Sequence, residues 1–316
     1  MNSAIGACAL VAVPTVARAQ SYPTRPVRLI VGQAAGSGSD VLARLMAQWL
    51  SDRLGQPFVV ENRPGAGGNI GAEAAVRATP DGHTLLLITS TNAINTALYD
   101  NLNFNVVRDI AAVGSVTLTP YALVANPSFS PKTIPEFIDY ARANPGKLNM
   151  ASGGNGSVSH ASCELFKLMT GINVVHVPYR GSTPAHVDLL GGQVQAMFDA
   201  MTSSIEHIKS GRLRVLGVTS ATRAELLPDV PTVDDFVPGY EVNAWLGIGA
   251  PRNTPPDIVD LLNNEINLAV ADPKIKSRLL ELGGSVLATS PAKFAKLIAE
   301  DAEKWRKVVT LGGLKP

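Results

Sequence analysis

The sequence predicts an α/β protein in which strands and helices alternate, and three observations support this fold class. Short apolar runs rich in β-branched residues, of which residues 27–31 are typical, resemble buried strands. Several of these runs lead through a turn of small residues into apolar residues at helical spacing. The chain has 316 residues, of which 46% are hydrophobic, so it can bury a large core, and its length favours two domains. Alternating strands and helices indicate parallel sheets.

The first 20 residues differ from the rest of the chain. Residues 4–13 form an uninterrupted apolar run, and Ala17-Arg18-Ala19 resembles the small-residue cleavage site of a secretory signal peptide. The run is much shorter than the roughly 18 residues that a membrane-spanning helix needs. We therefore expect a signal peptide over residues 1–20, cleaved near Ala19 or Gln20, and a secreted protein. Its removal leaves Cys163 without a partner for an intrachain disulfide.

The hydrophobic periodicity, together with the glycine and proline residues that end helices and strands, places the elements of the mature chain in order. The expected strands cover residues 27–31, 58–61, 84–88, 113–116, 121–125, 148–151, 174–178, 196–198, 213–219 and 246–250. The expected helices cover residues 41–50, 70–77, 135–143 and 161–169, a segment that begins near Pro184, and residues 204–210, 255–271, 273–282 and 291–310.

The first strand leads into an unusual turn, residues 32–39, which contains no large side chain and three glycines. Asp40 follows at the expected N-cap of the first helix. A small-residue turn before a helix exposes backbone N–H groups that can bind an anion. Neither G-x-G-x-x-G nor G-x-x-x-x-G-K-[ST] is present, and no lysine precedes Lys132, so this is not a typical nucleotide site.

Turns of the same character recur along the chain. They lie at residues 32–40, 62–69, 89–92, 152–160, 179–183 and 199–203. In parallel α/β sheets ligands bind at the carboxyl ends of the strands, which is where these turns are expected. Their recurrence favours a binding site for an anion over a set of ordinary connections.

Composition and motifs exclude several classes of function. A formal net charge of +1 and an aromatic content of 5% argue against a nucleic-acid partner. No G-x-S-x-G, H-E-x-x-H or paired-cysteine motif occurs, so we expect no cofactor, no metal and no catalytic residue. One alternative stays open, a hydrolase that uses Ser157 or Ser159 with His160.

Longer ordered motifs carry a family resemblance over residues 22–316. They are Tyr22-Pro23-Thr24-Arg25-Pro26-Val27, the turn ending in Asp40 with Ala43-Arg44, and the runs at 61–68, 178–185 and 188–194. With them the chain resembles the receptors of tripartite tricarboxylate transporters, the Bug-type periplasmic solute-binding proteins. The first turn departs from the family pattern, because it reads Gln33-Ala34-Ala35-Gly36-Ser37-Gly38-Ser39 where the family has Pro or Phe and consecutive glycines.

The resemblance implies a two-lobed type II periplasmic binding protein fold, with parallel-sheet lobes joined by two crossing segments. We expect lobe 1 at residues 21–121 and 247–316, and lobe 2 at residues 122–246. It further implies a monomer that captures a small organic carboxylate (a di- or tricarboxylate, an amino-acid-like acid or an aromatic acid) and delivers it to the membrane subunits of such a transporter.

In the family the loops equivalent to residues 32–40 and 152–160 hold one carboxylate, partly through ordered water. Candidates for selectivity are Asn92, Tyr179, Trp245 and Asp199, and Asp199 follows an apolar strand directly. The expected ligand-binding residues are Gln33, Ala35, Gly36, Ser37, Ser39, Ser90, Asn92, Ser152, Gly153, Asn155, Gly156, Ser157, His160, Tyr179, Ser182, Thr183 and Asp199.

Overall fold

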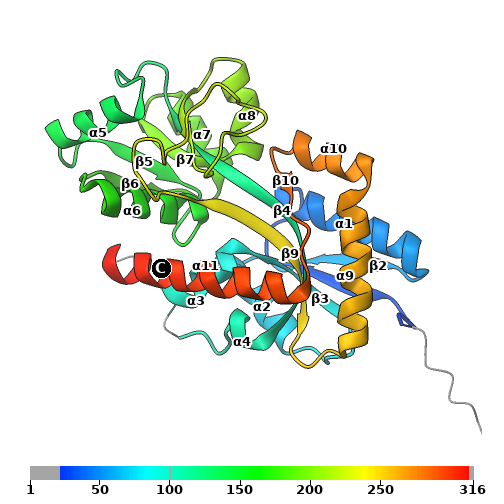
Figure 1. Cartoon of the computed structure of the whole chain (residues 1–316). Helices are drawn as coiled ribbons and strands as arrows, with labels where there is room; N and C mark the ends of the chain where they lie inside the picture. Colours follow the sequence, from blue (N-terminus) through cyan, green and yellow to red (C-terminus); the bar gives the residue numbers. More distant parts are fainter. Residues whose placement is uncertain (1–21, 100, 313–316) are drawn as a thin grey trace, which may run out of the picture.

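The computed structural model describes residues 22–99 and 101–312 (Figure 1), so the expected signal peptide lies outside the described residues. The strands are β1 (Val27–Val31), β2 (Phe58–Asn62), β3 (Thr84–Thr89), β4 (Ile110–Ala125), β5 (Asn149–Ser152), β6 (Val175–Pro178), β7 (Ala196–Ala200), β8 (Arg214–Val218), β9 (Asn243–Pro251) and β10 (Ser285–Val286). The helices are α1 (Gly38–Leu54), a short 3₁₀ turn η1 (Ala66–Gly68), α2 (Asn69–Val76), α3 (Ser90–Leu98), α4 (Val106–Asp109), α5 (Ile134–Ala143), α6 (Val158–Thr170), α7 (Ser182–Leu190), α8 (Met201–Lys209), α9 (Pro256–Ala271), α10 (Pro273–Glu281) and α11 (Pro291–Gly312). None of these helices has both the length and the apolarity to cross a membrane.

The first half of the molecule, named for its N-terminal strands, is the sheet formed by β1–β3, β9, β10 and residues 110–120 of β4. Helices cover both faces of this sheet. Its strand order is β2-β1-β3-β9-β4, with β10 also paired to β4. Strands β2, β1 and β3 are parallel, whereas β9 runs antiparallel to β3 and β4. Neighbouring residues of a strand point to opposite faces. Leu29 therefore packs with α1 and α9, while Ile30 packs with α2 and α11.

The second half is built in the same way around the far end of β4. Strands β6, β5 and β7 are parallel, and the last five residues of β4, Tyr121–Ala125, pair antiparallel with β7 and β8. Leu123 faces α5 and α6, whereas its neighbour Val124 faces α7 and α8. Both sheets thus present the carboxyl ends of their parallel strands to a following helix.

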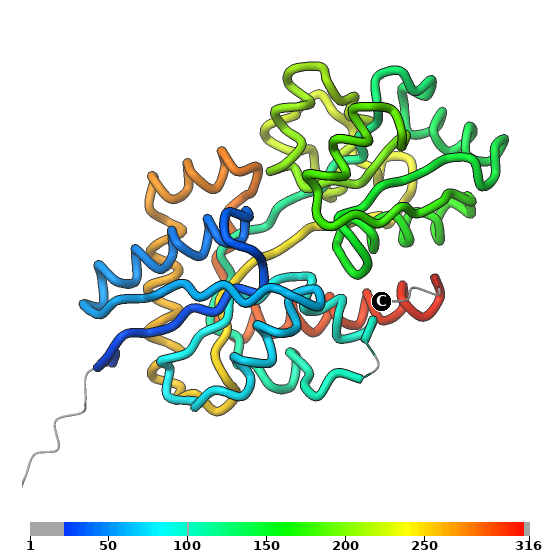
Figure 2. The backbone as a smooth tube through the Cα atoms, turned by 180° about the vertical axis from the view of Figure 1, so that it is seen from behind, coloured from blue at the N-terminus to red at the C-terminus, as the bar shows by residue number. Residues whose placement is uncertain are grey.

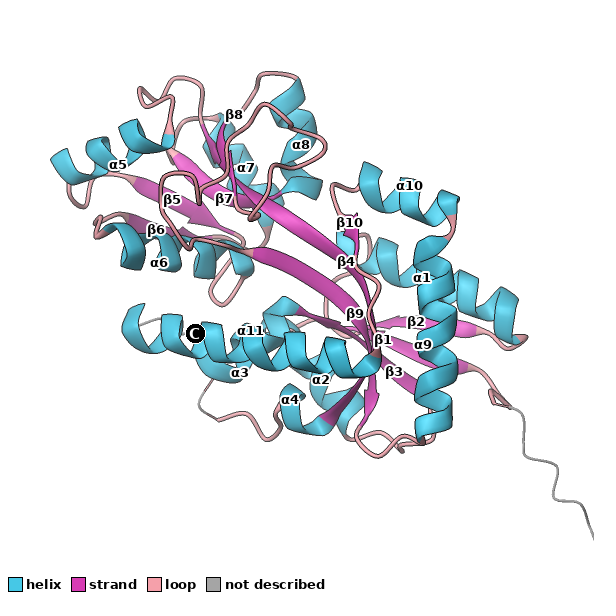
Figure 3. Ribbon diagram, in the orientation of Figure 1, coloured by secondary structure: helices cyan, strands magenta, loops and turns pink. Residues whose placement is uncertain are grey.

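Strands β4 and β9 connect the halves (Figure 3). Ile110–Pro120 of β4 pair with β9 in the first sheet, and from Tyr121 onward β4 belongs to the second sheet. The sequence pattern had indicated two strands, 113–116 and 121–125, but they form one continuous strand. Register shifts between Ala112 and Gly114 and between Ser115 and Thr117 bend β4 without ending it.

Helix α11 packs against both halves. Phe294 and Ile298 belong to the core of the first sheet, whereas Trp305 and Val308 belong to the core of the second. Seen from behind, the C-terminal helix (red) extends from the first half beneath the green second half (Figure 2). Along this path α11 packs against α3, β4 and α6.

Candidate ligand-binding site

The first turn is organised by Ser37 and Asp40. Ser37, and not Asp40 as expected, is the N-cap of α1, because its Oγ accepts a hydrogen bond from the Asp40 amide at 3.3 Å. The Asp40 carboxylate instead accepts from the Gly36 amide at 2.9 Å and from Asn62 Nδ2 at 2.9 Å, and pairs with Arg44 at 3.0 Å. Burial alone would raise the pKa of Asp40, but hydrogen bonds from Arg44, Gly36 and Asn62 lower it to about 2. Asp40 is therefore an anion that locks the turn.

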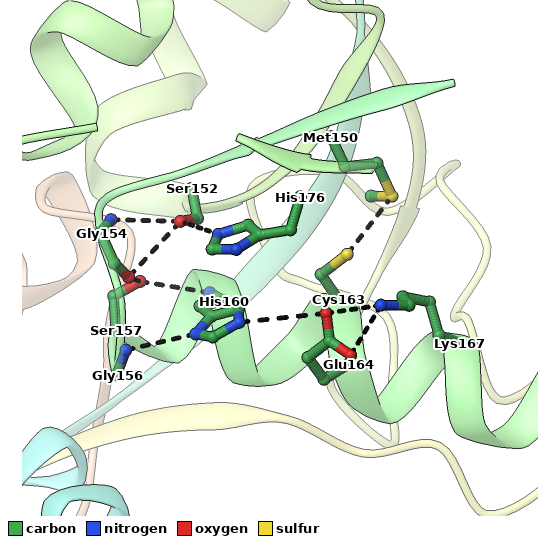
Figure 4. Close-up of polar contacts among 10 residues, drawn as sticks. All are labelled: Met150, Ser152, Gly154, Gly156, Ser157, His160, Cys163, Glu164, Lys167 and His176. Atoms are coloured by element: carbon green, nitrogen blue, oxygen red, sulfur yellow. Dashed lines mark hydrogen bonds and ion pairs between the residues drawn. The ribbon is translucent and has the colours of Figure 1, made fainter. Parts of the chain in front are cut away.

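The turn at residues 152–160, called the second turn below, repeats this geometry (Figure 4). Ser157 is the N-cap of α6, and its Oγ accepts from the His160 amide at 3.2 Å. The Gly156 amide donates to His160 Nδ1 at 3.2 Å, as the Gly36 amide donates to Asp40. Gly36 and Gly156 have φ angles of 81° and 73°, which favour glycine in both turns. The two turns read Gly-Ser-Gly-Ser-Asp and Gly-Ser-Val-Ser-His.

Each turn leaves backbone donors free. The amides of Gly38 and Ser39 open α1, and those of Val158 and Ser159 open α6, so they have no acceptor within their own helix. Elsewhere in the described ranges 22–99 and 101–312 no protein group accepts from these four amides. Such amides, at the positive end of a helix dipole, are suited to a carboxylate or another small anion.

Residues 65–69 and α3 link the two turns. Asn95 Nδ2 donates to the Gly67 carbonyl at 2.9 Å and to Asn69 Oδ1 at 3.0 Å. The oxygen of the same side chain lies toward the second turn, since a Cβ at Gly156 would lie 3.1 Å from Asn95 Oδ1 and 2.6 Å from Leu98 Cδ2. The second turn therefore packs closely against α3 of the first half.

Three buried polar atoms in this region have no hydrogen-bond partner among the described residues. They are Gln33 Oε1, Asn69 Nδ2 and Asn95 Oδ1. Buried polar groups in native proteins are nearly always paired with protein, water or ligand, so this cluster marks the place where a bound group is expected. Gln33 was predicted, whereas Asn69 and Asn95 were missed. Asn69 is the last residue of the turn predicted at 62–69, and this position is the sequence feature that could have identified it.

The remaining expected residues of the first half lie at the start of α3. The predicted turn at 89–92 is instead a direct strand-to-helix junction, so Ser90 and Asn92 lie in the first helical turn. Both side chains are buried, and Asn92 Oδ1 accepts from the Thr89 amide at 2.9 Å. Ala35, by contrast, is exposed in the first turn.

The second turn is joined to the neighbouring loop at 179–181. Ser152 Oγ accepts from the Gly154 amide at 3.1 Å, and the Gly153 carbonyl accepts from the Gly181 amide at 3.1 Å. Asn155, at the tip of the turn, is exposed.

Tyr179, Ser182, Thr183 and Asp199 lie around the start of α7. Thr183 is exposed, and Tyr179 Oη donates to Asp188 at 2.6 Å. Burial, together with Asp188, raises the pKa of Tyr179 to about 12.

Asp199 is fully buried at the end of β7, and α8 begins two residues later without the turn expected at 199–203. Its carboxylate oxygens lie 3.0 Å from Ser182 Oγ, 2.6 Å from Ser203 Oγ and 2.7 Å from His186 Nε2. These contacts occupy Asp199 within the fold of the second half.

The hydrolase alternative requires a serine hydroxyl hydrogen-bonded to the His160 ring. Ser157 Oγ instead donates to the Gly154 carbonyl at 2.7 Å, and Ser159 Oγ donates to the Phe198 carbonyl. His160 Nδ1 is occupied by the Gly156 amide. Neither Ser157 nor Ser159 is therefore activated by His160, and the geometry gives this alternative no support.

Comparisons with known proteins agree with this geometry. The family model described as the tripartite tricarboxylate transporter family receptor matches residues 42–314. Protein BugT of Bordetella pertussis is 38% identical over 300 residues, which cover 94% of this chain and 92% of BugT.

Solved structures are similar over nearly the whole chain. An R. palustris protein with adipate is 35% identical, with a TM-score of 0.85 and coverage of 93% of this chain and 99% of that one. MatC from Rhodopseudomonas palustris with bound malate is 34% identical, with a TM-score of 0.82 and coverage of 91% and 100%. The periplasmic binding protein BugD is 35% identical, with a TM-score of 0.82 and coverage of 93% and 99%. The matches confirm the predicted periplasmic binding protein fold, and the chain belongs to the tripartite tricarboxylate transporter receptor family, whose members are solute-binding receptors and not enzymes.

Proposed function

We propose that this receptor captures a small organic dicarboxylate between the turns at 32–40 and 152–160 and delivers it to the membrane subunits of a tripartite tricarboxylate transporter. The observation that carries the proposal is the pair of Gly-Ser-x-Ser turns, each with two free amides at a helix N-terminus. The similar R. palustris proteins with adipate and malate, both dicarboxylates, support the ligand class.

Beside the turns, the unpaired Asn69 Nδ2 is a further donor for a carboxylate, whereas the unpaired oxygens of Gln33 and Asn95 only accept and therefore suit ordered water or a hydroxyl of the ligand. A charge-assisted hydrogen bond contributes about 1.5–3 kcal/mol. Three or four of them, less the cost of ordering the ligand, give a binding free energy of about −8 kcal/mol, which is a micromolar dissociation constant. No lysine or arginine is needed in contact with the ligand.

We further propose that the two halves move as lobes about β4 and β9. The change of partner between Pro120 and Tyr121 of β4 supports one hinge there. On the returning strand the Val242 amide still bonds the Thr219 carbonyl of the second half, and Asn243 pairs with Pro120 in the first sheet. We therefore propose the second hinge at Val242–Asn243, a few residues before the boundary at 246–247 that the sequence suggested.

Secretion and assembly are part of the same proposal. The mature receptor begins near Gln20 or Ser21 and acts as a monomer. Mass spectrometry of the secreted protein gives the cleavage site, and light scattering with and without ligand gives the oligomeric state.

Calorimetric titration of the purified mature chain tests the ligand class. We expect adipate or malate to bind, and uncharged 1,6-hexanediol, which has the length of adipate, not to bind. Stabilisation against heat should accompany binding, by about 2.7 kcal/mol at 100 times the dissociation constant. Equal binding of the diol, or binding of sugars or amines but of no carboxylate, would contradict the proposal.

A further inference from the structure

Two imidazole rings lie against each other behind the second turn. His160 belongs to the first turn of α6 and His176 to β6, and their rings are stacked with centroids 3.9 Å apart and planes 8° apart (Figure 4). His176 Nε2 is 2.6 Å from Ser152 Oγ, which in turn accepts from the Gly154 amide at 3.1 Å. His160 Nδ1 accepts from the Gly156 amide at 3.2 Å. Two amides of the turn are thus held by the stacked pair, one directly and one through Ser152.

The bond from Gly156 fixes the protonation of His160. Because Nδ1 accepts, a neutral ring carries its proton on Nε2, which lies 3.9 Å from Glu164 Oε1. Both Glu164 oxygens are bonded by Lys167 Nζ at 2.8 Å. Burial, together with His176 and Lys167, lowers the pKa of His160 to about 3, and burial and Lys167 lower that of His176 to about 4. Both rings are therefore neutral near pH 7, as the hydrogen bond from Gly156 requires.

The first turn shows why the stack matters. There Asp40 accepts from Gly36, and its carboxylate is held in place by Arg44 and Asn62. In the second turn a neutral ring performs the same task, and a ring must be held in the right plane to accept from Gly156. Stacking on His176 supplies that restraint from a different strand.

We propose that His176 is a positioning residue for ligand capture, which acts through its stack with His160 and its bond to Ser152. It fixes the turn at 153–157 so that the free amides of Val158 and Ser159 face the ligand. This inference rests on the proposed function, because it assumes that the second turn binds the ligand.

Variants separate the two contacts of His176. His176→Phe keeps a flat ring for the stack but loses the bond to Ser152, His176→Gln keeps a polar atom near Nε2 but loses the ring, and His176→Ala loses both. We expect His176→Ala to weaken adipate or malate binding at least tenfold. The affinities of the other two variants should lie between those of His176→Ala and the native protein. The circular dichroism spectrum should be unchanged.

The same logic applies to His160. Asn places its side-chain oxygen where Nδ1 lies, so His160→Asn should rescue most of the affinity that His160→Leu loses. The Asn side chain does not depend on a stack. The ligand affinities of His176→Phe and His176→Ala should therefore differ less when residue 160 is Asn than when it is His. This non-additivity is expected only of residues that act on one turn together.

The outcomes distinguish positioning from packing and from failure of the proposed function. If His176→Ala lowers the melting temperature but the folded variant binds like the native protein, His176 only packs, and the inference is wrong while the proposed function stands. If His160→Asn binds no better than His160→Leu, the acceptor role is wrong. If the native protein binds neither adipate nor malate, the proposed dicarboxylate function fails, and this inference fails with it.

Discussion

Asp40 and His160 perform the same task in two turns that lie in different halves of the molecule, since each accepts a hydrogen bond from the backbone amide four residues before it. Each also donates its own amide to the serine that caps its helix, Ser37 or Ser157. The two turns therefore present similar sets of free amides. They differ in charge, because Asp40 is an anion paired with Arg44 whereas His160 is neutral.

Alanine at the two turn glycines should separate backbone strain from contact between the halves. Gly36 and Gly156 both have positive φ, so each substitution should cost about 1–2 kcal/mol of stability. A Cβ at Gly36 meets no atom within 4 Å, whereas at Gly156 it lies 2.6 Å from Leu98 Cδ2. We expect Gly156→Ala to push the second turn away from α3 and to weaken adipate binding at least fivefold more than Gly36→Ala.

Calorimetry and small-angle X-ray scattering on both variants check this prediction. Gly156→Ala should show the larger radius of gyration with saturating adipate. Equal losses of affinity in the two variants would mean that the contact with α3 does not matter for binding.

Proline at Gly38 removes one proposed donor while keeping the helix. Gly38 is the first residue of α1, a position that favours proline, and Ser37 before it has φ −69° and ψ 161°, which is compatible with a following proline. We expect Gly38→Pro to weaken carboxylate binding by about 1.5–3 kcal/mol, the value of one charge-assisted hydrogen bond. Gly38→Ala, which keeps the amide and meets no atom within 4 Å, is the control.

Titration of the two variants with adipate and malate decides the matter, with thermal unfolding as the check on folding. A Gly38→Pro protein that binds as tightly as Gly38→Ala would show that this amide does not hold the ligand.

The sequence indicated most strands and helices because their burial follows local periodicity. It failed where polar residues are buried. The run at 89–92 looks like a turn, but Thr89 and Asn92 form a capping box and α3 begins at Ser90. Asn92 and Asn95 then interrupt the apolar stripe of α3, because Asn92 caps the helix and Asn95 bonds the Gly67 carbonyl and Asn69.

The geometry of the candidate site could be predicted in part. The turns at 32–40 and 152–160 could be identified because glycine and serine directly before a helix indicate a turn and an N-cap. Asp40 was misplaced, since Ser37 and Asp40 both suit an N-cap and only the fold shows which side chain the amide reaches. The link from Asn95 to Asn69 spans 26 residues, and the stack of His160 on His176 joins a helix to a strand, so neither leaves a local pattern.

Acid should destabilise the protein through the two stacked histidines. Above their ordinary pKa of about 6.5 both rings are neutral in the folded and unfolded chains, so they have no effect. As the pH falls below 6.5, the unfolded chain takes up protons that His160 and His176 resist until about pH 3 and 4. The two histidines therefore destabilise the folded state progressively as the pH falls from 6.5 to about 4 for His176 and to about 3 for His160. Asp40, whose pKa is about 2, adds a loss only below pH 3.8.

Urea unfolding at pH 7.0, 5.5 and 4.5 measures this slope. A double variant, His160→Asn with His176→Gln, has neither imidazole but retains Glu164 and Lys167, and it should lose less stability over the same range. The idea fails if the native protein and the double variant show the same pH dependence.

The last prediction concerns Asp199, whose carboxylate was expected to contact the ligand. In the structure it is fully buried and bonded to Ser182, Ser203 and His186. Asp199→Ala would leave these groups without their acceptor and should cost about 3–5 kcal/mol of stability, as expected when one partner of a buried pair is removed. Asp199→Asn has nearly the same shape and keeps one acceptor oxygen, so the loss should be smaller and the variant should fold. If Asp199 serves the fold, folded Asp199→Asn binds adipate with native affinity while its melting temperature falls by several degrees. A large loss of affinity at an unchanged melting temperature would instead place Asp199 in the ligand site, and calorimetry with thermal unfolding on this one variant distinguishes the two.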